Sequence, residues 1–166
     1  MKIKLFYILN GNNSATYIFN TSSWQNIGTS IKFYRAYKLK GKVQKKILQC
    51  FLFVVGKFIP RFFKSKEDIK IYLKENINQD VDFNLDSTIS VLISPTRDKV
   101  IVNHHAHYFQ KFAFGKSFKK VKNESFVYKL LQNSKEFQVA NVMDLKIDEQ
   151  LSSCNFKLVN PPVKTG

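Results

Sequence analysis

The chain has 166 residues, of which 44% are hydrophobic and 14% aromatic, enough for one domain of ordinary size with a real core. This composition excludes disorder of the whole chain, and six glycines and four prolines exclude a collagen-like or linker-like chain. Two cysteines cannot form a disulfide framework, which favours a reducing compartment. The 27 Lys and Arg residues outnumber the 12 Asp and Glu residues, so the net charge is +15.

The acidic residues are confined to the second part of the chain. Residues 1–66 carry 13 Lys and Arg and no acid, whereas residues 67–166 carry 14 basic and 12 acidic residues. The first segment therefore has a net charge of +13 and the second a net charge of +2. This asymmetry predicts a basic N-terminal region, residues 1–66, followed by a second domain, residues 67–166.

The N-terminus does not have the pattern of a secretory signal. Residues 1–10 begin with charge and contain a short apolar run, but no small-residue cleavage site follows. The strongest apolar stretch, Ile47 to Val55, is too short to cross a hydrocarbon core of about 30 Å. We therefore expect a soluble or peripheral protein in the cytoplasm, with the inner membrane face as the site of any peripheral attachment.

The N-terminal region shows a strand pattern and then a helix pattern. Apolar runs at residues 2–9 and 17–19, separated by a turn rich in Gly and Asn, predict a β-hairpin. Apolar residues then recur at steps of three and four, which predicts a helix near residues 41–59. The middle of this helix, residues 50–55, is apolar all round, so it is buried or faces a membrane or a partner.

Seven basic residues, interleaved with aromatic and aliphatic ones, lie within residues 31–46. Helical spacing places four of them on one face: Lys38, Lys42, Lys45 and Lys46. Because this segment leads directly into the apolar helix, its composition favours an anionic membrane surface over nucleic acid as its partner. A merely solvated face remains open beside the membrane surface, and an acidic protein partner is a further alternative. Nucleic acid is less favoured, because no recognisable nucleic-acid-binding module is present.

The second region predicts one short helix and then an α+β domain. Ser65, followed by Glu67 and Asp68, indicates the start of an amphipathic helix that ends near residue 78. Strands are predicted at residues 89–93, 99–102, 108–114, 137–143 and 153–159, with a helix at 117–133. The expected fold is α+β: a five-stranded antiparallel sheet with one packed helix, preceded by the basic hairpin and helices.

One strand and the helix after it carry two charged residues in apolar surroundings. Lys111 lies between large apolar side chains, so its ammonium must reach an edge or meet an anion. Glu124 falls on the apolar stripe of the helix, where a carboxylate is costly unless it is paired. These positions predict an ion pair between Lys111 and Glu124. Such a pair either ties the helix to the sheet or belongs to a nucleotide site.

At these residues the sequence resembles the small, N-terminal lobe of kinase-like phosphotransferases, especially divergent bacterial kinases of small molecules and sugars. Residues 108–114 are similar to the strand that carries the nucleotide-binding lysine, and residues 122–131 to the helix that carries its glutamate partner. The resemblance implies that Lys111 holds the α- and β-phosphates of ATP and that Glu124 orients it. Residues 157–162 would be the fifth strand running into the hinge.

The same resemblance indicates which nucleotide-binding and catalytic elements of a kinase occur in this chain. Residues 94–98 take the place of the glycine-rich phosphate loop; they contain no glycine, and Ser94 and Thr96 are the candidate nucleotide contacts. No catalytic-loop Asp, metal-binding Asn or Asp-Phe-Gly element follows, so ATP and Mg²⁺ are expected only with a C-terminal lobe. As it stands the chain should not catalyse phosphoryl transfer.

The predicted function is therefore the N-terminal lobe of an atypical bacterial small-molecule or glycan kinase. Its alternatives are a non-catalytic membrane-surface or protein-interaction domain and, less favoured, a nucleic-acid binder. The remaining reactive residues predict no chemistry. His105 and His107 share a strand face but have no neighbouring Cys, Asp or Glu, so a solvated strand end is expected rather than a metal site. Cys50 is expected in the core, and Cys154 is expected to be inert.

Overall fold

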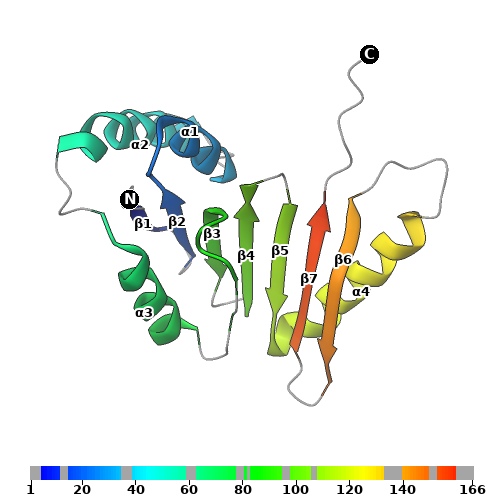
Figure 1. Cartoon of the computed structure of the whole chain (residues 1–166). Helices are drawn as coiled ribbons and strands as arrows, with labels where there is room; N and C mark the ends of the chain where they lie inside the picture. Colours follow the sequence, from blue (N-terminus) through cyan, green and yellow to red (C-terminus); the bar gives the residue numbers. More distant parts are fainter. Residues whose placement is uncertain are drawn as a thin grey trace. The chain divides into compact units, whose positions relative to one another are not determined.

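The computed structural model describes residues 5–11, 15–34, 39–58, 63–77, 81, 83–94, 98–105, 108–132, 140–149 and 153–159. Within them lie four helices and seven strands (Figure 1). In chain order these are β1 (Phe6–Asn10), β2 (Thr16–Asn20), α1 (Trp24–Phe33), α2 (Leu39–Phe58), α3 (Lys66–Asn76), β3 (Thr88–Ser94), β4 (Lys99–His104), β5 (Tyr108–Ala113), α4 (Gly115–Gln132), β6 (Asn141–Asp148) and β7 (Ser153–Val159). The fold class is α+β, as predicted.

The described strands form a sheet in the order β1-β2-β3-β4-β5-β7-β6, and the four ladders whose register is known are antiparallel. The sequence predicted a five-stranded sheet; the sheet also contains β1 and β2, the two strands of the N-terminal hairpin. The chain divides into two compact units, Met1–Leu92 and Ile93–Gly166. This division lies inside β3, whereas the charge distribution placed a boundary after residue 66.

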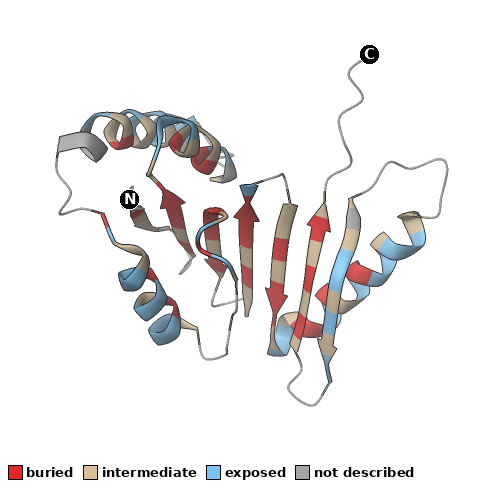
Figure 2. Ribbon diagram, in the orientation of Figure 1, coloured by how far each residue is buried: buried red, intermediate tan, exposed pale blue. Residues whose placement is uncertain are grey.

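In the first unit, the predicted hairpin is present, with β1 and β2 in register from Phe6 opposite Asn20 to Asn10 opposite Thr16. Helix α1, which the sequence patterns did not predict, begins after Ser23, whose side chain accepts a hydrogen bond from the Asn26 backbone N–H. The buried residues between the hairpin and the helices form one apolar cluster: Phe19, Ile27, Ile31, Leu52 and Phe63. Figure 2 shows this burial along β2 and on the facing sides of α1 and α2.

Helix α3 begins with the capping arrangement that its sequence predicts. The Ser65 hydroxyl accepts a hydrogen bond from the Asp68 N–H at 3.2 Å, and the Asp68 carboxylate accepts one from the Ser65 N–H at 2.9 Å. These hydrogen bonds hold the pKa of Asp68 below its usual value. The helix buries Ile69 and Leu73, one turn apart, and exposes its charged residues after the half-buried Lys66.

A buried amide joins the hairpin to β3. Asn20, at the end of β2, is 1% exposed; its Nδ2 donates to the Thr88 carbonyl at 2.8 Å, and its Oδ1 accepts from the Ser22 N–H at 2.9 Å. Close by, the Ser30 hydroxyl donates to the backbone carbonyl of residue 89 at 2.7 Å. A buried polar group without a hydrogen bond lowers the stability of the fold. These hydrogen bonds therefore fix the positions of β2, α1 and β3 relative to one another.

In the second unit, α4 packs on one face of β5, β7 and β6. Register places Lys111 of β5 between Ile101 of β4 and Phe156 of β7. The apolar layer between the helix and the sheet contains the following buried residues: Ala113, Phe118, Val121, Cys154, Phe156 and Leu158. A bulge between Met143 and Lys146 interrupts the β6–β7 ladder.

Replacing Asn20 tests the role of the buried amide. Asn20→Ala leaves the Thr88 carbonyl and the Ser22 N–H without this partner, so we expect the free energy of unfolding to fall by about 2 to 4 kcal/mol. Asn10→Ala removes the acceptor of a hydrogen bond from Thr16 at an exposed position and should cost less than about 1 kcal/mol. Urea unfolding of both variants measures the difference; equal losses would show that the Asn20 amide has no special role.

Candidate functional site

The candidate site is built around Lys111, which β5 places on the face of the sheet that α4 covers. Residues of one strand alternate between the two faces, so Lys111 shares its face with Phe109 and Ala113, both of which belong to the apolar layer under α4. Its side chain is only 14% exposed. The strand therefore carries its ammonium into a largely apolar layer, where an opposite charge is needed.

Helix α4 supplies that charge. Glu124 lies three residues after the buried Val121 and four before Tyr128, so it faces the sheet with them. Its carboxylate accepts a hydrogen bond from the Lys111 ammonium in an ion pair, and the Glu124 side chain is 29% exposed. The predicted pairing is thus present. The ion pair is therefore partly buried and still accessible to water.

Two aromatic rings complete the surroundings of the ammonium. The Lys111 nitrogen lies 5.7 Å from the ring centre of Tyr128 and 5.7 Å from that of Phe156. Rings at this distance attract a cation through their negative faces. An ammonium has three N–H bonds; the Glu124 carboxylate accepts one of them, and the two ring faces restrict the orientation of the ammonium further.

The other predicted nucleotide contacts are only partly described. Ser94 is the last residue of β3 and is half-buried, whereas Thr96 lies outside the described residues. Asp98, just before β4, has a positive φ of 44°; its carbonyl accepts from the Phe114 N–H at 2.9 Å, and its carboxylate accepts from the Lys116 N–H at 3.3 Å. Asp98 therefore fastens the start of β4 to the start of α4, a role that sequence reasoning missed.

Among the described residues, no group of three or more His, Cys, Asp and Glu side chains is placed to hold a metal ion. His104, the last residue of β4, is buried, His105 is exposed, and His107 lies outside the described part of the chain. The His104 ring stacks on Tyr108 with centroids 4.4 Å apart. Burial lowers the pKa of His104 to about 4, a hydrogen bond with Gln110 opposes that shift, and the positive charge of Lys157 adds to it.

The lysines of the predicted anionic surface belong to the first unit. Lys42 and Lys46 are exposed on α2, and Lys38 lies outside the described residues. Lys45 turns inward and donates to the Tyr34 carbonyl at 2.8 Å, and its partial burial lowers its pKa. On the predicted face, Lys42 and Lys46 are therefore open to an anionic surface, while Lys45 has a structural partner.

The two cysteines differ in environment. Cys154 is buried in the layer under α4, and burial raises the pKa of its thiol, as expected for an inert core residue. Cys50 is exposed on α2, so the prediction that it lies in the core is wrong. The apolar run around Cys50 suggested burial, but only one side of α2 packs against the rest of the first unit.

Further ion pairs in the second unit connect elements that sequence spacing did not relate. Lys157 of β7 contacts Asp144 at the β6 bulge, with 2.6 Å between Nζ and Oδ2. Its hydrogen bond lowers the pKa of Asp144 and raises that of Lys157. Lys122 of α4 pairs with Glu149 just beyond β6. The first pair depends on the pairing of β6 with β7 and the second on the packing of α4 against β6, so no local signal in the sequence could have found them.

Comparison of the chain with protein-family models, with curated proteins and with solved structures gives no match.

Removing Glu124 tests how strongly the buried lysine depends on its partner. Glu124→Ala leaves the Lys111 ammonium in an apolar layer, so the free energy of unfolding should fall by about 1 to 3 kcal/mol, between the values for exposed and fully buried pairs. The matched control is Glu149→Ala, which breaks a pair whose carboxylate side chain is 70% exposed and should cost less than about 1 kcal/mol. Urea unfolding compares them, and equal losses would argue that the Lys111 environment is not special.

The lowered pKa of His104 predicts acid sensitivity. The folded protein keeps this imidazole neutral down to about pH 4, whereas the unfolded chain takes up the proton near pH 6.5. The unfolded state thus binds more protons between these values, and the contribution of His104 to stability, present above pH 6.5, is lost as pH falls toward 4. The full loss is about 3 kcal/mol.

Unfolding experiments at pH 7.5 and pH 5 on His104→Gln and His105→Gln check this expectation. His104→Gln should flatten the pH dependence of stability, while the exposed His105→Gln should leave it as in the wild type. An unchanged pH dependence in His104→Gln would contradict the assignment.

Proposed function

We propose that β3 to β7 together with α4 form the nucleotide-binding small lobe of a kinase-like phosphotransferase. In this proposal Lys111 holds the α- and β-phosphates of ATP, and Glu124 orients the lysine. The observation that carries the proposal is the Lys111–Glu124 ion pair, which joins β5 to α4, the helix packed on that face of the sheet. This is the arrangement that a phosphate-binding lysine needs, because its partner prevents the ammonium from turning away.

The order of elements supports the proposal. Three strands, β3, β4 and β5, precede α4, and two strands, β6 and β7, follow it. The lysine is on the third strand and the glutamate on the helix, as the resemblance of residues 108–114 and 122–131 to a kinase small lobe implies. In the sheet β7 lies between β5 and β6, so the last strand of the series is central and adjoins the lysine strand.

The same geometry fits a nucleotide chemically. Because the Lys111 ammonium is held by a carboxylate and two ring faces, it could donate to phosphate oxygens without losing its first partner. Bound ATP with Mg²⁺ would supply the transferable phosphoryl group. A catalytic base and metal-holding acids would come from a C-terminal lobe, and a small molecule or glycan is the proposed acceptor. A nucleotide site also favours a cytoplasmic location.

Calorimetric titration of the chain with Mg·ATP tests this function. We expect weak binding without turnover, lost by about tenfold or more in Lys111→Met and reduced in Glu124→Gln, because the phosphates lose their charged donor or its orientation. Lys157→Met is the matched control: it removes the same charge from the neighbouring strand, where the lysine pairs with Asp144, and should leave affinity within about twofold.

Two results would oppose the proposal. Equal affinity of the wild type and of folded Lys111→Met would place the nucleotide elsewhere. No binding at millimolar Mg·ATP would favour the alternative, in which the ion pair only fastens α4 to the sheet. ATP turnover by pure protein, abolished in Lys111→Met, would overturn the expectation that this chain lacks catalytic groups.

A further inference from the structure

Helix α2 has an apolar face that is exposed. Four large apolar residues on it are between 52% and 79% exposed, and the exposed Cys50 lies among them. We call this set the α2 stripe; it consists of Leu39, Val43, Ile47, Cys50 and Val54. With 3.6 residues per turn, these residues fall within an arc of about 80° and run along most of the helix. An exposed apolar surface of this length indicates an interaction site.

The stripe is distinct from the face that holds α2 in the fold. Leu52 is fully buried in the cluster with Phe19 and Ile31, and Leu48 packs beside it on the side of the helix opposite the stripe. Phe51 also packs inward, with its ring 6.0 Å from that of Tyr7. The helix is therefore anchored by one side and presents the α2 stripe on the other.

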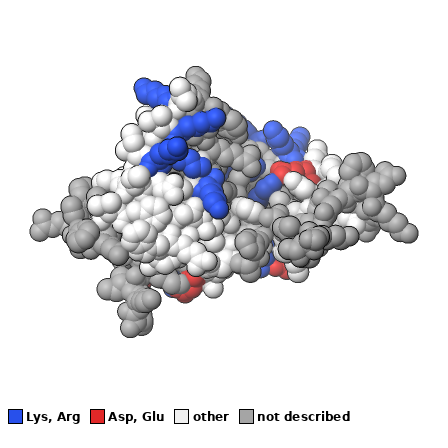
Figure 3. Space-filling model, turned by 90° about the horizontal axis from the view of Figure 1, so that it is seen from above, with Lys and Arg blue, Asp and Glu red and all other residues white. Residues whose placement is uncertain are grey.

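Lysines border the stripe on both sides. By helical geometry Lys42 and Lys46 lie along one edge and Lys40 along the other, and all three are exposed. No Asp or Glu occurs before residue 67 to offset them. Figure 3, which views the α1–α2 side, shows lysine side chains among uncharged atoms there. An apolar band between cationic edges complements a surface with an apolar interior and an anionic boundary.

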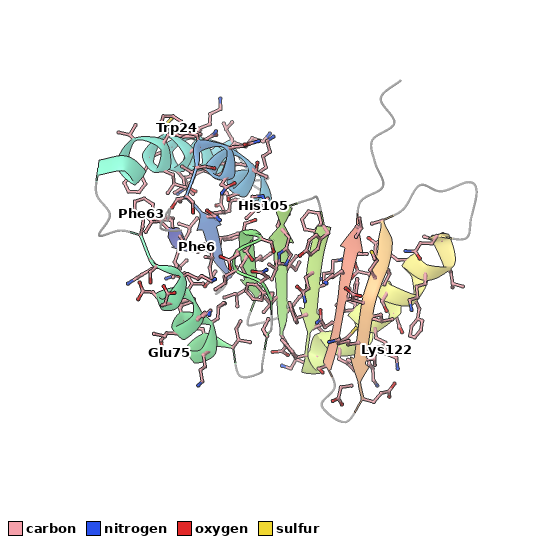
Figure 4. The ribbon with its side chains drawn as sticks, viewed as in Figure 1. Phe6, Trp24, Phe63, Glu75, His105 and Lys122 are labelled. Carbon is pink, nitrogen blue, oxygen red and sulfur yellow. The ribbon has the colours of Figure 1, made fainter. Side chains whose placement is uncertain are left out.

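An aromatic ring extends the same side. Trp24, at the start of α1, is more than half exposed (Figure 4). Its ring stacks on that of Phe53 of α2, with ring centroids 4.9 Å apart and an interplanar angle of 26°. By helical geometry Phe53 lies between Lys42 and Lys46, at the edge of the stripe. Tryptophan is enriched where water meets lipid, because its ring is apolar and its N–H is polar.

We propose that α2 lies in the plane of an anionic lipid surface, with the α2 stripe among the acyl chains and its lysines at the level of the phosphates. No helix within the described ranges is long and apolar enough to cross a membrane, so the contact is in the plane. Nucleic acid would neutralise the lysines but would give the aliphatic stripe nothing to pack against. This inference is independent of the nucleotide site, and its test does not involve ATP.

Vesicle binding by the whole chain tests the inference. Trp24 is the only tryptophan in the sequence, so its fluorescence reports on this side alone. With vesicles of phosphatidylcholine and phosphatidylglycerol we expect co-sedimentation and a blue shift of emission, both falling as salt increases. Vesicles of phosphatidylcholine alone should bind much more weakly.

A matched pair of variants separates insertion of the stripe from attraction by charge. Ile47→Asp places a carboxylate in the centre of the stripe, and Ile71→Asp makes the same change at an isoleucine of α3 that is 58% exposed. Insertion predicts a loss of affinity of at least about tenfold for Ile47→Asp and less than about threefold for Ile71→Asp. Replacing Lys40, Lys42 and Lys46 by Gln should weaken binding by about a hundredfold if all three engage.

Thermal melts establish that the variants are folded, and Val43→Asp serves in place of Ile47→Asp if that variant melts early. Equal affinity of folded stripe and α3 variants would overturn the proposal, because charge alone would then explain binding. So would absence of binding to the anionic vesicles, or tight binding to single-stranded RNA or an acidic peptide without preference for anionic lipid.

Discussion

The packing of the second unit depends on an ammonium held in an apolar layer. Lys111 points from β5 toward α4, and Glu124 meets it from the helix. Because neither charge can be buried cheaply alone, the pair couples the position of α4 to the central strands, and the rings of Tyr128 and Phe156 restrict it further. An ion pair serving only stability could be replaced by apolar residues of similar volume. The presence of an ion pair at this position would be explained if the ammonium has a second anion to bind, as the proposed function assigns.

The first unit has an apolar core, but it also buries some polar groups and exposes some apolar ones. Asn20 and Ser30 are buried with their hydrogen bonds made to the backbone of β3, so the unit tolerates polar side chains inside. Meanwhile Val43 and Ile47 remain exposed on α2. A helix that is apolar on two faces, one buried and one open, fits a boundary between protein and lipid better than it fits a helix surrounded by water.

The two proposals concern separate residues and separate chemistry. The proposed nucleotide binding would depend on Lys111 and Glu124, and the proposed attachment to an anionic surface would depend on the α2 stripe and its bordering lysines. Their common element is anion recognition, which accords with the excess of basic residues in the chain. A small-molecule or glycan kinase whose lobe attaches to the membrane would act on acceptors available at that surface, and each proposal can fail without the other.

The sequence by itself determined the elements whose signals are local. Apolar periodicity indicated α2 and the strands, the Ser65 cap marked the start of α3, and opposite charges on apolar faces of neighbouring elements predicted the Lys111–Glu124 pair. Other features were decided only by tertiary structure. The hairpin pairs into a seven-stranded sheet, and the Asn20 side chain donates a hydrogen bond to β3. On α2, Cys50 is exposed while Phe51 packs against the core. These outcomes depend on contacts between residues far apart in the chain. In an apolar run such as residues 50–55, periodicity cannot tell which face will be covered until those contacts have formed.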